Sequence, residues 1–306
     1  MPAQPRFSVV CPVHNRPELV RAAIDSVLAQ TFSDYELIVV DDGSTDATPE
    51  VVRSYGGRVT LLQQPKSGAE AARYLGVTHA RGEYLIGLDS DDLFYPEAFA
   101  VYDRTLRAFD DPPVLMAAMS YFEDGQAVPV NPPSDGSIEC LRYKDFLSKD
   151  QTFGVCYTQL VLQRSTALAM AAVPSTATAF PFDIADVLLR VGTCSPFIKI
   201  CRPYTVAYRV HATNSIQDLN GLLRKAPCLA RYERQGQYPG GSARRFERRS
   251  YIGTLCASYA LQGLRRKRFG LSAKLVLATA PMVLAGVLKL IKRRFRRRVM
   301  PVRLPA

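Results

Sequence analysis

The sequence lacks the cysteine patterns that mark disulfide-rich and zinc-binding proteins. Its seven cysteines are odd in number and widely scattered, with no C-x-x-C pair, so neither a disulfide framework nor a zinc site is indicated. No G-x-G-x-x-G follows the first strand-like segment, which argues against a dinucleotide-dependent dehydrogenase. The first residues also lack the apolar run of a secretory signal, so we expect a cytoplasmic protein.

Acidic residues are almost absent from the last part of the sequence. From Gly241 onward there are 17 Lys and Arg residues and a single acidic residue, Glu247, whereas residues 1–240 carry a net charge of −5. The net charge of +11 therefore belongs to the C-terminal end. A mildly acidic body would repel a phosphate backbone, which argues against nucleic-acid binding, and the basic end favours contact with an anionic membrane surface.

Strand-like and helix-like segments alternate in the first hundred residues. Apolar strands are predicted at 7–12, 35–40, 59–63 and 84–88, and helices at 17–30, 48–55, 69–80 and 96–109. This α/β pattern predicts a parallel sheet covered by helices on both faces. Ligands of such sheets bind at the carboxyl ends of the strands, where the loops 12–15, 41–46 and 89–92 should meet.

The second half of the sequence has a different pattern. Residues 110–150 are interrupted by proline and glycine, and helix-like segments at 143–147 and 164–172 precede strand-like segments at 197–202 and 205–209. Regular alternation of strand and helix therefore ends near residue 110, and an α+β arrangement is expected beyond it.

Asp89-Ser90-Asp91-Asp92 directly follows an apolar strand. Carboxylates this close repel one another unless a cation lies between them. Oxygen ligands of this kind favour Mg²⁺ or Mn²⁺, which keep open positions for substrate phosphates. The alternative is that Asp89 or Asp92 only caps the helix that follows.

Residues 7–99 resemble the family 2 glycosyltransferases, and residues 182–215 do so more weakly. The resemblance rests on five segments in family order, namely Ser8–Arg16, Ser26–Phe32, Tyr35–Asp46, Gly68–Gly76 and Gly82–Asp92. It implies a GT-A fold, which is a Rossmann-like, mostly parallel sheet flanked by helices, here with a basic helical C-terminal extension. The implied division is a nucleotide-sugar-binding half at 1–110, an acceptor and catalytic-base half at 111–220, and a helical region at 221–306.

The resemblance also implies an activity. Family members transfer a sugar with inversion from a nucleotide-diphosphate sugar, here expected to be a UDP-sugar, with Mn²⁺ or Mg²⁺ as cofactor. The expected acceptor is a hydroxyl group of a lipid-linked or cell-surface glycan.

The resemblance assigns donor-site roles to particular residues. Pro12, Val13 and Asn15 would frame the nucleotide, Asp42 would accept a hydrogen bond from the base, and Arg73 would lie near the nucleotide. Asp91, with Asp89 or Asp92, would hold the metal and the ribose. Such a metal would neutralise the diphosphate leaving group. Pro12 could instead simply end its strand, and Asp46 is expected to be a helix cap.

The catalytic base is expected in Phe182–Arg190. The family places an Asp in a Glu-Asp pair ahead of an apolar helix, whereas this sequence has Asp183 and Asp186 in a shifted register. Residues three apart on a helix share a face, so both could point inward, and Asp183 is favoured because it is nearer the loop. Both could instead cap a helix.

Tyr208-Arg209-Val210-His211 resembles the closing motif of the family. The resemblance implies that Arg209 approaches the diphosphate, since a guanidinium suits phosphate oxygens, and that His211 approaches the metal. A histidine at a strand end is also often structural.

The last apolar segment, residues 275–288, is too short to span a bilayer, and a polybasic run follows it at 292–298. This pattern predicts an interfacial anchor at residues 271–298, which would hold the protein on the inner face of the cytoplasmic membrane. The alternative is a buried helix with a solvated tail.

Other functions fit the sequence less well. A nucleotidyltransferase would have a Gly-rich loop after the first strand, and the loop at 11–16 has no glycine. A phosphatase would place its acidic cluster after the first strand rather than the fourth. A nucleotide-sugar binder without a catalytic base stays open because of the irregular Asp183 region.

Overall fold

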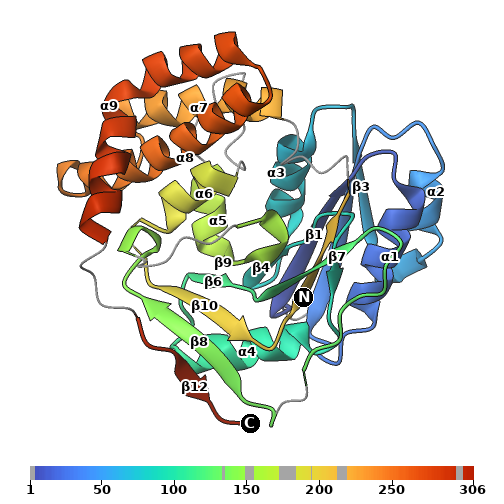
Figure 1. Ribbon diagram of the computed structural model, residues 1–306. Coiled ribbons are helices and arrows are strands. Elements are labelled where there is room, and N and C mark those ends of the chain that lie inside the picture. Colours follow the sequence, from blue (N-terminus) through green and yellow to red (C-terminus); the bar gives the residue numbers. More distant parts are fainter. Residues whose placement is uncertain are drawn as a thin grey trace.

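The computed structural model describes residues 4–132, 135–148, 155–171, 184–193, 195–211, 219–293 and 299–306. Its centre is a nine-stranded sheet with the order β12-β8-β10-β6-β9-β4-β1-β2-β3 (Figure 1). The strands are β1 (Phe7–Val13), β2 (Tyr35–Asp42), β3 (Thr60–Gln64), β4 (Tyr84–Gly87), β6 (Val114–Met116), β8 (Ile138–Tyr143), β9 (Leu160–Gln163), β10 (Phe197–Arg202) and β12 (Val302–Leu304). Seven of these nine strands run in the same direction, and β8 and β9 run opposite to them, so most strands of the sheet are parallel to one another.

Helices cover both faces of the sheet. One face carries α1 (Pro17–Leu28), α2 (Thr48–Arg53) and α4 (Ala98–Ala108), and the other carries α3 (Ala69–His79), α5 (Arg164–Ala171) and α6 (Ile184–Val191). Side chains of β2 alternate between the two hydrophobic clusters, because successive residues of a strand point to opposite faces. The α/β fold expected from the sequence is confirmed.

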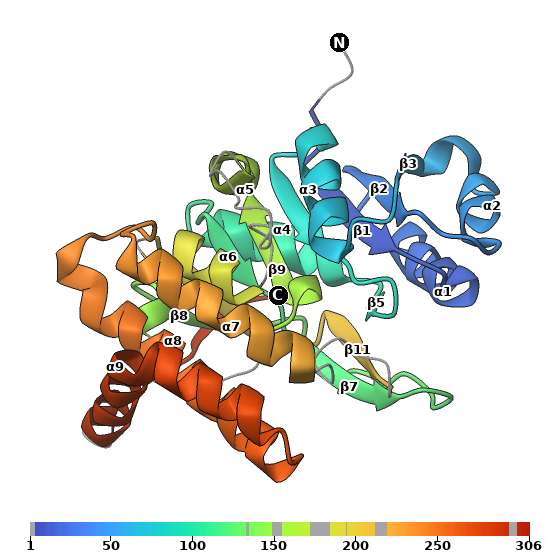
Figure 2. The same ribbon diagram turned by 90° about the horizontal axis from the view of Figure 1, so that it is seen from above.

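Three further helices form a layer beside α5 and α6. They are α7 (Leu219–Arg234), α8 (Arg245–Arg265) and α9 (Phe269–Arg293). Figure 2 shows α9 on the side of this layer farthest from the sheet. Buried residues of all three helices belong to the same hydrophobic cluster as α3, α5 and α6, so the layer shares a core with the sheet.

A second sheet of three strands lies next to the carboxyl end of β4. It has the order β5 (Leu93–Phe94), β11 (Val206–Val210) and β7 (Met119–Glu123), with β11 parallel to β7 and antiparallel to β5. Because β5 directly follows the acidic cluster, its pairing with β11 brings residues 208–211 beside residues 89–92.

The elements predicted for residues 7–109 all occur, with small shifts at their ends. Two predictions further along are wrong. Residues 143–147 are not a helix, because β8 continues to Tyr143 and a single turn follows at Phe146–Ser148. The C-terminal apolar segment was predicted to be too short to span a bilayer, but α9 extends beyond 275–288 in both directions. Its part Phe269–Gly286 is long and apolar enough to cross a membrane, by length and composition.

Candidate active site

A cavity of about 270 Å³ opens at the carboxyl ends of β1, β2 and β4. Its lining comes from the ends of these strands and the loops after them, from the loop after β3, from α3 and from β11. The lining residues are Pro12, Val13, His14, Arg16, Asp42, Lys66, Ala69, Arg73, Asp89, Ser90, Asp91 and Tyr208. The three loops expected to converge at the sheet edge therefore do so. Many of the lining side chains are charged, so the cavity suits a charged ligand.

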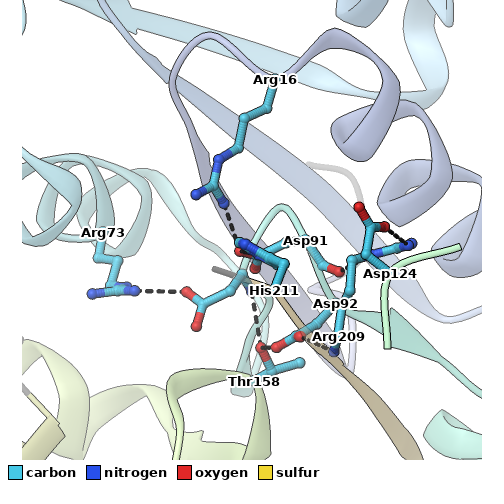
Figure 3. A network of polar contacts seen from close by, with 9 residues as sticks. Arg16, Arg73, Asp91, Asp92, Asp124, Thr158, Arg209 and His211 are labelled. Carbon is cyan, nitrogen blue, oxygen red and sulfur yellow. Dashed lines mark hydrogen bonds and ion pairs between the residues drawn. The ribbon is translucent and has the colours of Figure 1, made fainter. Parts of the chain in front are cut away.

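Asp91 lies where the charged groups at the cavity meet. Its Oδ2 atom accepts a hydrogen bond from Arg16 Nη1 at 2.6 Å and lies 2.9 Å from His211 Nε2 (Figure 3). Arg16 comes from the loop after β1 and His211 directly follows β11. Three segments distant in the sequence thus meet at one carboxylate oxygen.

Asp92 is turned away from this point. Its Oδ2 atom accepts a hydrogen bond from the Thr158 hydroxyl at 2.6 Å, and its Oδ1 atom accepts one from the Arg209 backbone N–H at 3.1 Å. Burial, with the nearby carboxylates of Asp89 and Asp91, raises the pKa of Asp92 well above its usual value. Both oxygens serve protein donors, so the geometry favours a positioning role for Asp92 over metal ligation.

Asp89 forms an ion pair with Arg73. The distance from Arg73 Nη2 to Asp89 Oδ1 is 2.6 Å, and the guanidinium lies 4.2 Å from the centre of the Tyr157 ring. Burial raises the pKa of Asp89, although Arg73 opposes this. The Asp89 backbone N–H donates to the same Thr158 hydroxyl that binds Asp92, so one residue of the loop before β9 orders both ends of the acidic cluster.

Asp42 is buried at the end of β2 and holds the loop before α3. Its carboxylate accepts hydrogen bonds from Gln64 Nε2, the Ser67 and Gly68 backbone N–H groups and Lys66 Nζ, at 2.8 to 3.2 Å. Although burial alone would raise it, these hydrogen bonds lower the pKa of Asp42. Asp42 is ionised and fixed on the cavity wall.

Some residues at the end of β1 and in the loop after it line the cavity, and others hold this loop against the loop after β2. Pro12 and Val13 line the cavity. Asn15 is not among the lining residues and has a left-handed φ of 50°. Its Oδ1 accepts a hydrogen bond from the Thr45 backbone N–H at 2.8 Å, and its own N–H donates to the Ser44 hydroxyl. Asn15 therefore joins the loops after β1 and β2.

Arg209 connects the acidic cluster to the second sheet. Its Nε donates to the Asp91 carbonyl at 3.0 Å, its Nη1 lies 2.8 Å from Asp124 Oδ1, and its guanidinium packs 4.7 Å from the centre of the Phe122 ring. These contacts place Arg209 beside the cavity lining, within reach of the acidic loop.

Of the two expected bases, only Asp186 is among the residues that the structure describes. Asp183 lies outside the described residues. Asp186 is buried on α6, where its Oδ2 lies 2.8 Å from Arg190 Nε and its Oδ1 accepts a hydrogen bond from the Tyr238 hydroxyl at 2.8 Å. Both oxygens of Asp186 have protein partners, which favours a structural role and leaves Asp183 as the preferred candidate.

Several residues of the site had no predicted role. Arg16 and Lys66 contribute cationic groups to the cavity lining, Tyr208 contributes a ring, and Thr158 positions the acidic loop. Arg16 directly follows Asn15 in the first loop, so its proximity to the site could be inferred from the sequence. Thr158 is 66 residues from Asp92 and carries no local signal.

Asp91 and His211 are the side chains best placed to hold a divalent cation. In the described part of the chain no three His, Cys, Asp or Glu side chains converge as a complete ligand set. An oxygen and an imidazole nitrogen 2.9 Å apart suit an ion such as Mn²⁺ that takes its remaining ligands from substrate phosphates and water. Asp91 and His211 therefore fit as two ligands of such a cation, which would take the place of Arg16 Nη1 beside Asp91 Oδ2.

Solved structures of other proteins share this fold. TarS of S. aureus in complex with UDP-GlcNAc has a TM-score of 0.67 and is 15% identical, with 92% of this chain and 81% of that chain covered. A mannosyltransferase from Pyrobaculum calidifontis in complex with GDP-Man and Mn²⁺ has a TM-score of 0.50 at 18% identity, with 94% and 88% covered. The fold is thus that of GT-A proteins.

Sequence comparison defines the family. The family described as glycosyl transferase family 2 matches residues 8–168, and this chain belongs to it. An uncharacterized glycosyltransferase of Rickettsia typhi is 37% identical over 112 residues, which is 37% of this chain and 35% of that protein. Glycosyltransferase GlyA of Streptococcus pneumoniae is 36% identical over 90 residues, or 28% of this chain and 13% of that protein. The chain spans about a third or less of the length of these relatives.

Proposed function

We propose that this protein is an inverting, metal-dependent hexosyltransferase that uses a UDP-sugar as donor. The observation that carries the proposal is the position of Asp91 at the cavity, within 2.9 Å of both Arg16 and His211. Family membership and the nucleotide-sugar complexes of similar structures support it.

The residues of the cavity suit a nucleoside diphosphate. Arg16, Lys66 and Arg73 line the cavity and are each paired with a carboxylate, at 2.6 to 2.9 Å. Guanidinium groups bind phosphate oxygens through two parallel hydrogen bonds, so the diphosphate can take the place of a carboxylate partner. At the other side of the lining, transfer of Lys66 Nζ from Asp42 Oδ2 to the diphosphate would leave that oxygen with the Gly68 N–H alone, so Asp42 would accept a hydrogen bond from a base N–H, which uracil offers.

Asp91 and His211 would hold the cation. When bound, a divalent ion supplies positive charge that stabilises the diphosphate leaving group. Arg209 would keep the acidic loop in place through the Asp91 carbonyl. Asp89 would stay paired with Arg73 and orient that guanidinium along the cavity wall.

Transfer with inversion needs a base on the acceptor side. Asp183 is the proposed base, because both oxygens of Asp186 are held by Arg190 and Tyr238. The base would remove the proton of the acceptor hydroxyl as that oxygen attacks the sugar.

The proposed acceptor is a lipid-linked or cell-surface glycan, and the proposed location is the inner face of the cytoplasmic membrane. The basic C-terminal region supports both ideas, since a protein held at an anionic membrane surface meets lipid-linked acceptors there. The main alternative is a nucleotide-sugar binder without turnover, which the displaced base motif favours.

Asp91→Asn tests the donor site. We expect UDP affinity in the presence of Mn²⁺, measured by calorimetry, to fall at least about tenfold, or about 1.4 kcal/mol, because the cation loses its carboxylate ligand. Asp135→Asn is a matched control, since Asp135 is exposed and lies outside this cavity. Equal Mn²⁺-dependent affinity in wild type and Asp91→Asn would remove the metal assignment.

A panel of UDP-sugars with Mn²⁺ tests turnover. We expect released UDP with at least one donor and loss of this signal in Asp91→Asn. Tight UDP binding without release of UDP from any donor would favour the binder instead.

A further inference from the structure

The outer face of α9 is apolar and exposed. Its exposed apolar side chains are Phe269, Val276, Leu277, Leu284 and Leu288, of which Leu277 and Leu284 are 79% and 62% exposed. Consecutive members of this set are separated by 7, 1, 7 and 4 residues, and at helical periodicity these separations keep them, with Ala273 and Ala280, along one side of the helix. Exposed apolar surface of this extent marks a contact site.

The opposite face of α9 is fixed against α8. The Gly253 backbone approaches the Met282 carbonyl so closely that a Cβ on Gly253 would lie 1.7 Å from its oxygen, and a Cβ on Gly286 would lie 2.8 Å from the Thr254 backbone nitrogen. The Ser250 hydroxyl also donates to the Ala285 carbonyl at 3.1 Å. Because these helices pack backbone to backbone, the inner face of α9 is occupied and only its outer face is available for a partner.

Basic side chains lie next to the apolar face. The corner between α8 and α9 contains four consecutive basic residues, Arg265 to Arg268, all exposed, between the exposed Leu264 and Phe269. Lys274 is exposed one turn further along. Glu247 is the last acidic residue of the sequence, so this surface has no acidic residue from α9 or from the last turns of α8.

This surface is distinct from the polybasic run at 292–298, which follows the other end of α9. Basic residues therefore flank the helix at both ends, with the apolar face between them. A spanning helix would carry its two ends to opposite sides of the bilayer, whereas a helix in the interface keeps both sets of charges at the lipid headgroups.

We infer that the exposed face of α9 and the Arg265–Arg268 corner dock the folded protein on an anionic lipid bilayer, with α9 lying in the plane of the interface. This inference rests on the proposed membrane location and names the surface that makes the contact. The apolar side chains enter the boundary between headgroups and acyl chains, and the corner arginines bind the anionic headgroups. A bilayer is favoured over a second copy of this chain because like-charged corners would repel each other.

Sedimentation with lipid vesicles tests whether the basic residues of the α8–α9 corner bind anionic headgroups. Substitution of Arg265, Arg266 and Arg268 by Gln should reduce binding of the full chain to phosphatidylglycerol-containing vesicles at least about tenfold at low salt. Lys267 is left unchanged because its φ of 58° is left-handed. The matched control replaces the exposed Arg53, Arg58 and Arg107 by Gln and should bind like wild type. Equal losses in both triple variants would overturn the role of the corner.

Introduced tryptophans test the orientation, because the sequence contains none. Leu277→Trp and Leu284→Trp replace exposed side chains and should shift their fluorescence to shorter wavelength with anionic vesicles. Both should be quenched most by lipids brominated near the headgroups. Val130→Trp, which is 89% exposed on a distant loop, should not respond. Positions 277 and 284 lie near the middle of α9, so stronger quenching of both by lipids brominated near the bilayer centre would show a spanning helix and overturn the inference.

Two further measurements distinguish docking on a bilayer from dimer formation and from damage to the nucleotide site. Sedimentation velocity without lipid should give a monomer, and a dimer that is lost in Leu277→Ser would assign the face to a second copy instead. UDP affinity in the presence of Mn²⁺ should be unchanged in all these variants, since none of the substituted residues lines the cavity. Loss of vesicle binding with normal UDP binding therefore tests the docking surface alone.

Discussion

Asp186 shows how a carboxylate can match a catalytic motif and still serve the fold. Its exposed fraction is 3%, and its two oxygens contact Arg190 and Tyr238 on different segments. The guanidinium of Arg190 also lies 5.3 Å from the centre of the Tyr238 ring. A general base needs a free lone pair to accept the proton of the acceptor hydroxyl, and Asp186 is not placed to offer one. Substitutions of Asp183 and Asp186 should therefore have different effects on transfer and on stability.

We predict that Asp186→Asn destabilises the protein by about 3–5 kcal/mol, since the change leaves the buried charge of Arg190 without its partner. Urea unfolding measures this. Asp183→Asn should instead leave UDP binding intact and remove transfer. If Asp186→Asn stays fully stable and loses transfer while Asp183→Asn remains active, the assignment is reversed.

The position of a single site residue could be predicted from the sequence where it depends on the neighbouring residues alone. The acidic cluster at 89–92 stands directly after an apolar strand, so its position at the sheet edge follows from the strand pattern alone. Which of its carboxylates faces the cavity does not follow, because that depends on Thr158 and Arg209, which come from other parts of the chain. Asp92 was predicted as a metal ligand, and its carboxylate oxygens accept hydrogen bonds from Thr158 and Arg209, so its role at the metal stays a prediction.

The same limit applies to whole elements. The alternating half, from β1 to α4, was predictable because each strand and helix has its own hydrophobic period. β6, β8 and β9 were not predicted. They are only three to six residues long, and β8 and β9 pair with distant strands in antiparallel fashion. Segments so short take their structure from tertiary pairing rather than from local pattern.

The packing of α9 on α8 gives a prediction at the scale of elements. Gly253→Ala should destabilise the protein by about 1–3 kcal/mol or more, because the new Cβ would lie 1.7 Å from the Met282 carbonyl and would force the helices apart. Gly270→Ala is the matched control on α9, where the added Cβ meets no atom within 4 Å and should stabilise by about 0.4–1 kcal/mol. Equal urea midpoints for the two variants would show that the close contact is not maintained in solution.

At the scale of the whole molecule, the helical layer and the catalytic sheet share one hydrophobic cluster. Ile252 and Cys256 of α8 and Met282 of α9 belong to the cluster that also contains Phe146 and Phe197. The ring of Tyr251 on α8 lies 5.4 Å from that of Phe146, edge to face. The division at residue 221 separates a region of different composition, and the packing argues that this region does not unfold independently.

Ligand binding at the sheet edge should therefore protect the helical layer. At a concentration of UDP with Mn²⁺ about 100 times its Kd, the native state gains about 2.7 kcal/mol. Because amides in the core exchange through global unfolding, hydrogen exchange should slow by a similar factor in β1 and in α8. The exposed segment 125–127 should exchange without global unfolding and is the internal control. Protection of β1 without protection of α8 would show that the helical layer opens on its own, so that its core is coupled to the sheet only weakly.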